Sequence, residues 1–308
     1  MKAITYSQYG GPEVLTLADV AEPKVGPAEI RIAVKSAAVN PVDWKIMAGY
    51  LDGLLHVDFP VIPGWDVAGV VEAVGLDAGE FQVGDEVLAY GRKDWVQGGS
   101  FAEKITVPVR TAAKKPASVS WDEAAALPLA GLTAFQTLKR LGVGEGDTVL
   151  VHGAAGGVGA LAVQLAKAFG ASRVIGTASQ KNHDYLRELG AEPVAYGAGL
   201  VQRVRDLVPD GVDVVADYAG GVEADTVAVL ATGGRHGSIV DDSVAELGGL
   251  YMWVRPDAND LADLARLVEH DLVKVTIAHT FPLDQAARAF TTNMEGHGRG
   301  KIVIRVTD

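Results

Sequence analysis

A glycine-rich segment in the middle of the chain has the residue types and spacing of a phosphate-binding turn. The apolar run Val149–His152 leads into Gly153-Ala154-Ala155-Gly156-Gly157-Val158-Gly159, and an apolar helical pattern follows. Gly156 would let backbone N–H groups approach a pyrophosphate at the start of that helix, and Gly159 would let helix and strand pack closely. Ala154 stands where the usual dinucleotide pattern has its first glycine. A turn required only for packing is the alternative. The candidate cofactor contacts in the turn are Ala155, Gly156, Gly157 and Val158.

The residues after the next apolar segment bear on which cofactor the turn would hold. Enzymes that use NAD usually carry Asp or Glu about 20 residues further on, where it binds the ribose hydroxyls. This chain has Gly176–His183 there, with no acid before Asp184. The hydroxyl of Ser179 and the ammonium of Lys181 suit a 2′-phosphate better than a diol, so NADPH is the predicted cofactor. The alternative is that Ser179 caps a helix and Lys181 is a solvated residue of its first turn.

Strands and helices alternate around this turn from about Trp121 onward. Apolar strands are expected at 148–152, 173–176, 193–196, 213–217 and 238–240, with helical patterns between them, and 251–254 could add another strand. This alternation predicts right-handed crossovers and a doubly wound parallel sheet. Residues 122–141 are expected to form two helices or one broken helix, because Pro128 and Gly131 interrupt the pattern.

The first part of the chain has a different pattern. Short alternating segments at 30–34, 67–74, 85–89 and 102–107 are divided by Pro and Gly, which predicts a twisted, barrel-like β domain. The tail at 300–306 is also β-like and is expected to return to that domain. The predicted organisation is a domain of residues 1–118 with a C-terminal return at 274–308, and a nucleotide-binding domain of residues 119–273.

The composition excludes several classes of protein. The 308 residues carry 27 Lys and Arg against 39 Asp and Glu, a net charge of −12, which disfavours nucleic acid and acidic membranes as partners. There is no cysteine, so disulfides, thiol nucleophiles and thiolate zinc sites are excluded. The most apolar stretch, 149–166, is interrupted by His152, Gln164 and four glycines, which is too broken for a membrane span. Residues 1–6 have the pattern of a strand, and a cytoplasmic protein is predicted.

The whole chain resembles the zinc-independent quinone oxidoreductase branch of the medium-chain dehydrogenase/reductase superfamily. The resemblance implies an α/β protein with an N-terminal GroES-like β-barrel domain and a Rossmann domain, a doubly wound parallel sheet that binds NADPH. These motifs are specific for the superfamily and fairly specific for the branch, but they do not identify a substrate. The segments that carry the resemblance are Asn40–Lys45, Pro63–Val71, Gly84–Val87, Gly99–Glu103, Ala126–Ala134, Ala154–Gly159 and Gly298–Val303.

Metal ligands of the zinc-dependent relatives are missing from this sequence. Those relatives carry a cysteine near Asn40 and a histidine at the position of Trp65, and their structural zinc lobe carries four cysteines. The seven histidines show no His-x-x-x-His spacing. We therefore expect metal-free chemistry, in which a group other than a metal ion stabilises any developing oxyanion.

The resemblance also implies roles for residues of the first domain and of residues 126–134. Asn40 and Thr133 would position nicotinamide or substrate through hydrogen bonds; the alternatives are a turn residue before proline and a helix hydroxyl bonded to its own backbone. Lys45 departs from the pattern, since many relatives carry Tyr near this position. As a lysine beside an apolar nicotinamide cleft it would polarise a carbonyl oxygen or donate a proton, and Tyr50 is a second possible donor. The alternatives for these two are a surface charge and a packed aromatic residue at the rim.

Further cofactor contacts are expected in the second half of the chain. Tyr196 matches a family position close to the adenosine phosphate, and Ala219 or Gly220 would offer backbone contacts after an apolar strand. Basic residues near the C-terminus would approach the phosphates or the nicotinamide amide. The alternatives are an ordinary strand tyrosine and a solvated tail. The basic residues in question are His297, Arg299 and Lys301.

The predicted function is an NADPH-dependent, metal-free oxidoreductase that transfers hydride to quinones or to the C=C bond of α,β-unsaturated carbonyls. An enoyl-thioester reductase and a non-catalytic NADPH-binding structural or sensor protein are the alternatives. Trp95 is a candidate for a substrate mouth, or a surface residue. Residues 251–255 are expected at a sheet edge that pairs in a homodimer, or else in the core. The acceptor and the proton donor, whether Lys45, Tyr50 or water, stay open.

Overall fold

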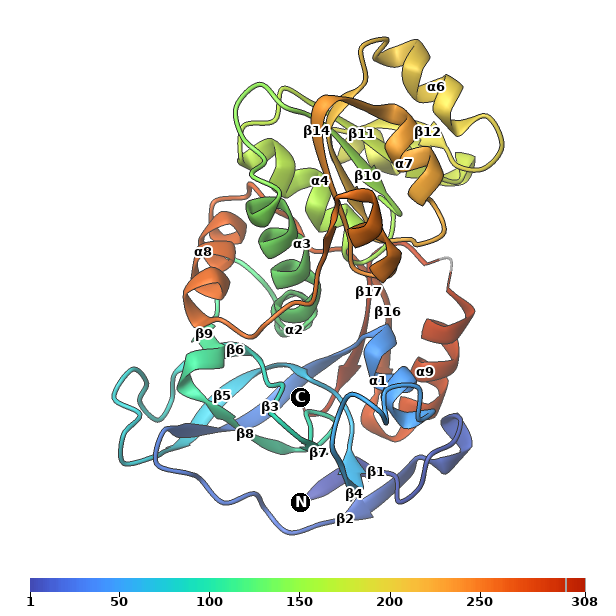
Figure 1. The fold of residues 1–308 in the computed structure, drawn as a ribbon. Coiled ribbons are helices and arrows are strands. Elements are labelled where there is room, and N and C mark those ends of the chain that lie inside the picture. Colours follow the sequence, from blue (N-terminus) through green and yellow to red (C-terminus); the bar gives the residue numbers. More distant parts are fainter. Residues whose placement is uncertain (297, 308) are drawn as a thin grey trace. The chain divides into compact units, whose positions relative to one another are not determined.

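The computed structural model describes residues 1–296 and 298–307, which fold into two compact units (Figure 1). Unit 1 comprises Met1–Leu132, Pro256–His270 and Val275–Asp308, and unit 2 comprises Thr133–Arg255 and Asp271–Lys274. Each unit has its own hydrophobic core. None of the helices in the described part of the chain is long and apolar enough to cross a membrane.

Unit 1 is built around a sheet whose strands run in the order β16-β17-β3-β5-β6-β9, with β8 also paired to β3. Two smaller sheets pair β1 with β2 and β4 with β7. The strands are β1 (Lys2–Thr5), β2 (Thr16–Asp19), β3 (Glu29–Val39), β4 (Val57–Ile62), β5 (Asp66–Val74), β6 (Glu86–Tyr90), β7 (Val96–Gly98), β8 (Lys104–Pro108), β9 (Ala112–Lys114), β16 (Ile277–Pro282) and β17 (Lys301–Arg305). The helices are α1 (Pro41–Met47), α2 (Trp121–Ala126), α8 (Ala258–Glu269) and α9 (Ala286–Glu295).

Strand β3 shows why this unit folds as a sheet. Its side chains alternate between buried and partly exposed over the first half of the strand, so that Ile30, Ile32 and Val34 enter the core. The last strand, β17, pairs antiparallel with β3, with Ile302 opposite Val39. The expected return of the C-terminal tail to the first domain is therefore confirmed.

Unit 2 contains a parallel sheet with the strand order β12-β11-β10-β13-β14-β15 in the described residues. From β10 the chain adds β11 and β12 on one side of the sheet, and it then crosses to the other side of β10, where it adds β13, β14 and β15. In sheets of this kind, ligands bind at the carboxyl ends of the strands where the order changes, here between β10 and β13. The strands are β10 (Thr148–His152), β11 (Arg173–Ala178), β12 (Glu192–Ala195), β13 (Val212–Asp217), β14 (Leu230–Ser238) and β15 (Leu250–Tyr251). The helices are α4 (Gly159–Ala168), α5 (His183–Glu188), α6 (Leu200–Leu207) and α7 (Glu223–Val229).

The doubly wound sheet predicted from the alternating pattern is confirmed, with two shifts in position. Strand β14 ends at Ser238, where the sequence pattern placed its start, and β15 covers Leu250–Tyr251 instead of 251–254. The expected break near Pro128 is also confirmed, because α2 ends at Ala126 and α3 covers Pro128–Arg140.

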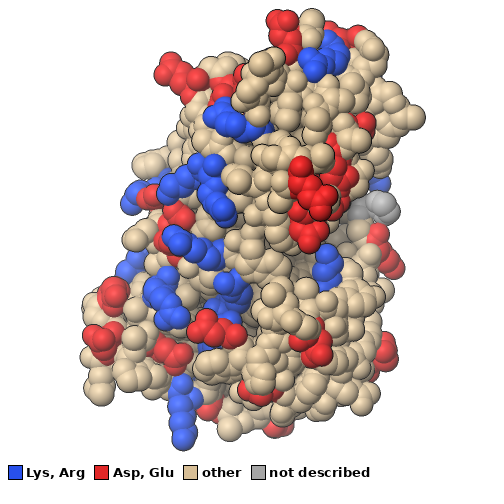
Figure 2. All heavy atoms as spheres, viewed as in Figure 1, with Lys and Arg blue, Asp and Glu red and all other residues tan. Residues whose placement is uncertain are grey.

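The units divide the chain at different residues from the predicted boundaries at 118 and 273. Helix α2 contacts strands β3 and β5, and α8 contacts β9, so both helices belong to unit 1. These are tertiary contacts of helices with distant strands, and an alternating pattern along the sequence does not show which sheet a helix covers. Figure 2 shows acidic and basic side chains on the same face, so locally positive sites are compatible with the net charge of −12.

Candidate functional site

The glycine-rich turn of unit 2 lies between β10 and α4. Gly153 has φ +68°, a left-handed conformation that favours glycine. The N–H of Gly156 donates to the carbonyl oxygen of Gly153 at 3.0 Å. A Cβ atom on Gly159 would lie 2.7 Å from the Cα of Ala154 and would also collide with the carbonyl oxygen of Gly153. Gly159 therefore lets helix and turn pack closely, as predicted. Because Gly156 uses its own N–H in the turn, a phosphate would meet the N–H groups that follow it.

The alanine that departs from the usual glycine pattern has a compensating glycine. Ala154 is fully buried, and its N–H is donated to the carbonyl oxygen of Thr177 at 3.0 Å. A Cβ atom on Gly176 of β11 would lie 2.8 Å from the Cβ of Ala154. The methyl group that Ala154 adds therefore occupies space that Gly176 leaves, and the turn keeps its close packing despite the substitution in the motif.

Three of the predicted cofactor residues follow two neighbouring strands of this sheet. Ala178 of β11 pairs with Ala195 of β12, so Ser179 and Tyr196 come next at the carboxyl ends of adjacent parallel strands. Ser179 precedes a 3-10 turn, but its hydroxyl makes no capping hydrogen bond, which weighs against the capping alternative. Tyr196 is 60% exposed, and Lys181 is exposed as well. The arrangement fits a phosphate that is held at the sheet edge by a hydroxyl, a phenol and an ammonium.

Arg203, a half-buried residue of α6, holds the loop that carries Tyr196 in place. Arg203 of α6 donates from Nε and Nη2 to the carbonyl oxygen of Ala195 at 3.1 and 2.8 Å. It also donates to the carbonyl oxygens of Gly197 at 3.1 Å and Ala198 at 2.9 Å. These bonds hold the backbone on both sides of Tyr196, so the phenol is presented from a fixed loop.

The loop after β13, where backbone contacts of Ala219 or Gly220 are predicted, is held by the Asp217 side chain. Asp217 accepts the N–H groups of Ala219 at 2.8 Å and Gly220 at 3.0 Å on Oδ1, and the hydroxyl of Ser238 at 2.7 Å on Oδ2. The N–H groups of Ala219 and Gly220 are thus used within the loop and do not point to a ligand. A contact of Ala219 with a cofactor would have to use its carbonyl oxygen, because Asp217 needs both N–H groups as partners.

His152, the last residue of β10, is buried and neutral, and its two ring nitrogens face threonine hydroxyl groups of the protein. Its Nδ1 lies 3.4 Å from the hydroxyl of Thr177, and its Nε2 lies 3.3 Å from that of Thr226. Burial lowers the pKa of His152, against the opposing effect of Asp217. Two threonine hydroxyls that join β10 to β11 and α7 therefore keep the end of this strand in place beside the glycine-rich turn.

A buried network in unit 1 gives Asn40 and Lys301 roles different from those predicted. Asn40 Nδ2 donates to Asp66 Oδ2 at 2.8 Å, and Lys301 Nζ donates to Asn40 Oδ1 and to the carbonyl oxygen of Val39 at 3.2 Å. Lys301 Nζ also lies 3.7 Å from Asp66 Oδ2. Asn40 is 2% exposed and Lys301 is 5% exposed. Buried polar groups must find partners, and these side chains supply partners to one another.

The electrostatics of this network follow from its burial. Burial lowers the pKa of Lys301, while Asp66 and Asp43 oppose that shift. Burial raises the pKa of Asp66 to about 6, although Lys301, Asn40 and the N–H of Leu129 favour its charged form. That N–H, in the first turn of α3, donates to Asp66 Oδ1 at 2.7 Å. Asp66 thus joins β5 to the start of α3, while Lys301 at the start of β17 holds Asn40.

A second buried acid, Asp43, lies in the first turn of α1. Its Oδ2 accepts the backbone N–H of Asn40 at 2.7 Å, and its own N–H is donated to the Asn40 carbonyl oxygen at 3.0 Å. Burial raises the pKa of Asp43 to about 8, and Asp66 adds to the shift while the Asn40 N–H and Lys301 oppose it. At neutral pH this carboxyl group therefore holds a proton.

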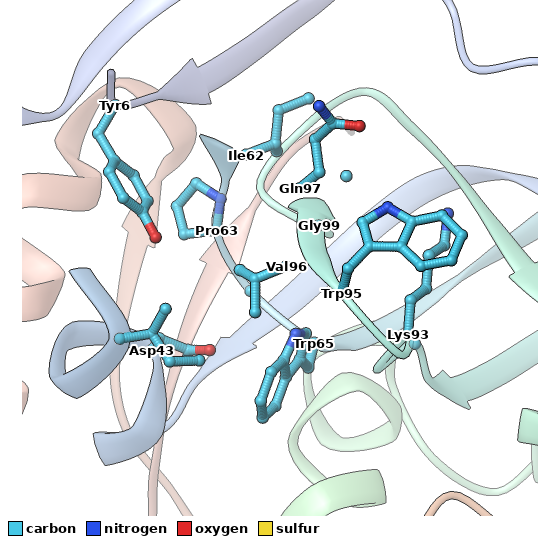
Figure 3. Close-up of a pocket in the computed structure, with 14 residues that line it drawn as sticks. Tyr6, Asp43, Ile62, Pro63, Trp65, Lys93, Trp95, Val96, Gln97 and Gly99 are labelled. Atoms are coloured by element: carbon cyan, nitrogen blue, oxygen red, sulfur yellow. The ribbon is translucent and has the colours of Figure 1, made fainter. Parts of the chain in front are cut away.

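Asp43 also lines a pocket in unit 1, together with aromatic residues (Figure 3). Tyr6 points its hydroxyl toward the side of the pocket where Asp43 lies, and Trp65 and Trp95 line the other side. Burial raises the pKa of Tyr6, and Asp43 contributes to this shift. Trp95, a candidate for a substrate mouth or a surface residue, lines this pocket and is 49% exposed. The lining of the pocket therefore combines aromatic rings with the Asp43 carboxyl group and the side chains of Lys93 and Gln97.

The two predicted proton donors of α1 and the turn after it are not among the residues that line this pocket. Lys45 Nζ lies 5.8 Å from the centre of the Trp44 ring, and Tyr50, which is 72% exposed, packs edge-on against the same ring at 6.2 Å. Both side chains lie against Trp44, which agrees better with the alternatives of a surface charge and an aromatic residue at the rim.

The remaining predicted residues lie elsewhere. Thr133 is buried in α3, and Arg299 is exposed. His297 lies outside the described residues.

Asp43, Asp66 and Tyr6 were not among the site residues predicted from the sequence. A signal for Asp43 was present, because Asn at a helix start followed three residues later by an acid is a capping pattern. Asp66 stood out as a charge within the apolar run from Trp65 to Val71. In the described part of the chain, His, Asp and Glu form no group of three or more that could hold a metal ion.

Comparisons with known proteins agree on the family. Residues 26–117 match the alcohol dehydrogenase GroES-like domain, and residues 189–304 match the model described as zinc-binding dehydrogenase. The chain is 37% identical over 313 residues to a 2-methylene-furan-3-one reductase of Solanum lycopersicum, covering 99% of this chain and 79% of that protein. It is 36% identical to a chloroplastic NADPH-dependent alkenal/one oxidoreductase of Arabidopsis thaliana, with the same coverage. The chain belongs to the quinone oxidoreductase branch of the medium-chain dehydrogenase/reductase superfamily.

The fold comparison supports the same assignment. The structure of the quinone oxidoreductase from Coxiella burnetii superposes with a TM-score of 0.87 at 34% identity, and the match covers 100% of this chain and 99% of that chain. Unit 1 corresponds to the GroES-like part and unit 2 to the Rossmann part of this superfamily, as the sequence resemblance implied.

Proposed function

We propose that this member of the superfamily is an NADPH-dependent, metal-free oxidoreductase that reduces quinones or the C=C bond of α,β-unsaturated carbonyl compounds. The observation that carries the proposal is the glycine-rich turn with Ser179 and Tyr196 on adjacent strand ends, where β11 ends without a carboxylate. The names of the relatives, a furanone reductase and an alkenal/one oxidoreductase, support the same substrate class.

The residues fit a nicotinamide dinucleotide by two structural tests. The space at Gly159 is available only because that residue has no Cβ atom, which is what a close turn beneath a pyrophosphate needs. The hydroxyl of Ser179 is not used as a helix cap. The bound cofactor supplies a hydride. The chain's own residues hold the phosphates at the turn and bind the 2′-phosphate through Ser179, Lys181 and Tyr196.

In this proposal the acceptor lies against the outer rim of the pocket of unit 1. Trp95, which is 49% exposed, offers an aromatic surface there on which a planar quinone or enone can stack. The network of Asn40, Asp66 and Lys301 fixes the start of α1, from which Asp43 faces the pocket. A cytoplasmic homodimer also belongs to the proposal. Strand β15 lies at the end of the described sheet of unit 2, and Tyr251 in it and Trp253 after it are each 40% exposed, which suits pairing with a second copy.

The cofactor part of the proposal is tested at Ser179. Ser179→Ala should raise the KM for NADPH about tenfold or more, since a hydrogen bond to a charged group contributes about 1.5–3 kcal/mol, and leave the KM for NADH unchanged. Ser179→Asp should favour NADH, because a carboxylate there repels the 2′-phosphate. Ser172→Ala is the matched control, since Ser172 precedes β11 at its opposite end. Equal effects on NADPH and NADH would contradict the assignment.

A further inference from the structure

Thr177, near the carboxyl end of β11, is bonded to two successive N–H groups of the glycine-rich turn. Its side-chain oxygen Oγ1 accepts the N–H of Gly153 at 3.2 Å, and its backbone carbonyl oxygen accepts the N–H of Ala154 at 3.0 Å. Thr177 is 3% exposed, and Ala154 is fully buried. The turn after β10 is therefore attached to the neighbouring strand at two adjacent points. Of these, only the bond to Gly153 depends on the type of side chain at position 177.

Other N–H groups of the turn are left for a ligand. Those of Ala155, Gly157 and Val158 donate to no acceptor in the described part of the chain. Unpaired backbone donors just before a helix are the groups that bind a pyrophosphate. They bind it together only if the turn is held in one conformation, and the two bonds to Thr177 hold its first part.

His152, the residue before the turn, orients the hydroxyl group of Thr177. Its Nδ1 lies 3.4 Å from Thr177 Oγ1, and its Nε2 lies 3.3 Å from the hydroxyl oxygen of Thr226. Because Thr177 Oγ1 accepts the Gly153 N–H, the hydrogen atom of its own hydroxyl group can donate to a bare Nδ1. The ring hydrogen of His152 is then on Nε2, where it donates to Thr226. His152 is 1% exposed, so water does not compete for these bonds.

We propose that Thr177 is a positioning residue of the pyrophosphate turn, whose hydroxyl group, oriented by the bare Nδ1 of His152, holds Gly153 so that the unpaired N–H groups of the turn face a dinucleotide. The inference rests on the proposed function, in which a nicotinamide dinucleotide is the ligand of this turn. The side-chain bond of Thr177 supports the pyrophosphate site, and NADPH and NADH share that group. Thr177 therefore contributes to the affinity for both cofactors, whereas Ser179, two residues further on, contributes to the choice between them.

The conformation of Gly153 explains why a hydroxyl group matters at this place. Gly153 has φ +68° and no side chain, so its conformation depends on its neighbours. With valine at position 177, the Gly153 N–H would face a methyl group and lose its acceptor. The turn would then reach other conformations, and the cost of returning it to the binding conformation would appear in the Kd of every dinucleotide.

The test variant is Thr177→Val, which keeps the shape of the side chain and removes the hydroxyl group. We expect isothermal titration to give a Kd for NADPH and a Kd for NADH that both rise about tenfold, as for the loss of one hydrogen bond that leaves a buried donor unpaired. Thr177→Ser retains the hydroxyl group and should restore most of the affinity for both. Thr111→Val is the matched control, because Thr111 is 1% exposed and its hydroxyl group donates to the Pro108 carbonyl oxygen at 2.9 Å in unit 1. This control should leave both Kd values unchanged.

Unchanged Kd values in Thr177→Val would overturn the proposal, and so would a rise confined to NADPH or an equal rise in Thr177→Ser. A measurement on the unmodified protein decides the question where Thr177→Val fails to fold. Nitrogen NMR of the His152 ring should show a bare Nδ1 and a protonated Nε2 at neutral pH, and a proton on Nδ1 would overturn the proposal. The proposed function fails separately, before any substitution, if the unmodified protein binds the dinucleotides but reduces no quinone or enone.

Discussion

Replacing Lys301 by methionine is the sharpest test of the buried network in unit 1. Methionine has nearly the same length but neither charge nor donor. Lys301→Met would remove the donors to Asn40 Oδ1 and to the Val39 carbonyl oxygen, and it would leave Asp66 without its cation at 3.7 Å. Because Asp66 is fully buried, water cannot replace the lost partner.

The size of the effect follows from this geometry. Two unit charges at 3.7 Å attract each other by about 4.5 kcal/mol at an effective dielectric constant of about 20. Removal of one partner of a buried pair typically costs about 3–5 kcal/mol. We expect a loss of that order in the free energy of unfolding. The loss should be smaller at low pH, because protonation of Asp66 removes the unpaired charge.

Urea unfolding followed by circular dichroism at pH 7.5 measures the loss. Lys2→Met is the matched control, because Lys2 and Asp19 form an ion pair at 2.7 Å in which both side chains are exposed. This pair is shorter than the buried one, yet we expect its loss to change the free energy of unfolding little, because exposed pairs are screened by water. The double variant Lys301→Met with Asp66→Asn should be more stable than Lys301→Met alone, because the unpaired charge is gone. A loss for Lys301→Met no larger than that for Lys2→Met would refute the reasoning.

Three further predictions concern the turn, the cofactor loop and the acid. Gly159→Ala should lower the free energy of unfolding by about 1–3 kcal/mol and weaken NADPH binding, because the added Cβ collides with the carbonyl oxygen of Gly153. Thermal unfolding measures the first effect, and isothermal titration of NADPH measures the second. Arg203→Gln should raise the KM for NADPH about tenfold and leave that for NADH unchanged, because the loop of Tyr196 loses several hydrogen bonds; steady-state kinetics with both cofactors check it. Asp43 holds a proton in the folded protein up to a pH of about 8, whereas the unfolded chain releases it near about 4, so the free energy of unfolding falls as the pH rises between these values. Urea titrations at several pH values should show a slope that is shallower in Asp43→Asn, by up to about 1.4 kcal/mol per pH unit.

The parts of the fold that could be predicted from the sequence depend on local patterns. The turn from Val149 to Gly159 has a spacing that only a strand, a tight turn and a helix satisfy together, and the structure has these elements there. The position of α8 could not be predicted in the same way. Its amphipathic pattern shows that one face is buried, but not that β9 of unit 1 covers it.

The positions of candidate site residues could be predicted where a local pattern sets them, but contacts between distant residues could not. Ser179 and Tyr196 follow apolar strands whose order in a doubly wound sheet is constrained, so the sequence could place both residues at neighbouring strand ends. Lys301 was predicted to approach the phosphates or the nicotinamide amide of a cofactor, with a solvated tail as the alternative. Its burial and its bond to Asn40, 261 positions away in the chain, could not be predicted, because a single sequence does not show which distant residues meet.

The most direct test of the proposed function is the absorbance of NADPH and NADH, followed in parallel with six acceptors. The acceptors are a benzoquinone, a naphthoquinone, an acyclic enone, an alkenal, an enoyl thioester and a simple ketone. We expect rapid oxidation of NADPH by the quinones or by the enone and alkenal, much slower oxidation of NADH, and no reaction with the ketone. NADPH that binds tightly but is oxidised by none of them, or a preference for NADH with the ketone, would contradict the proposed function.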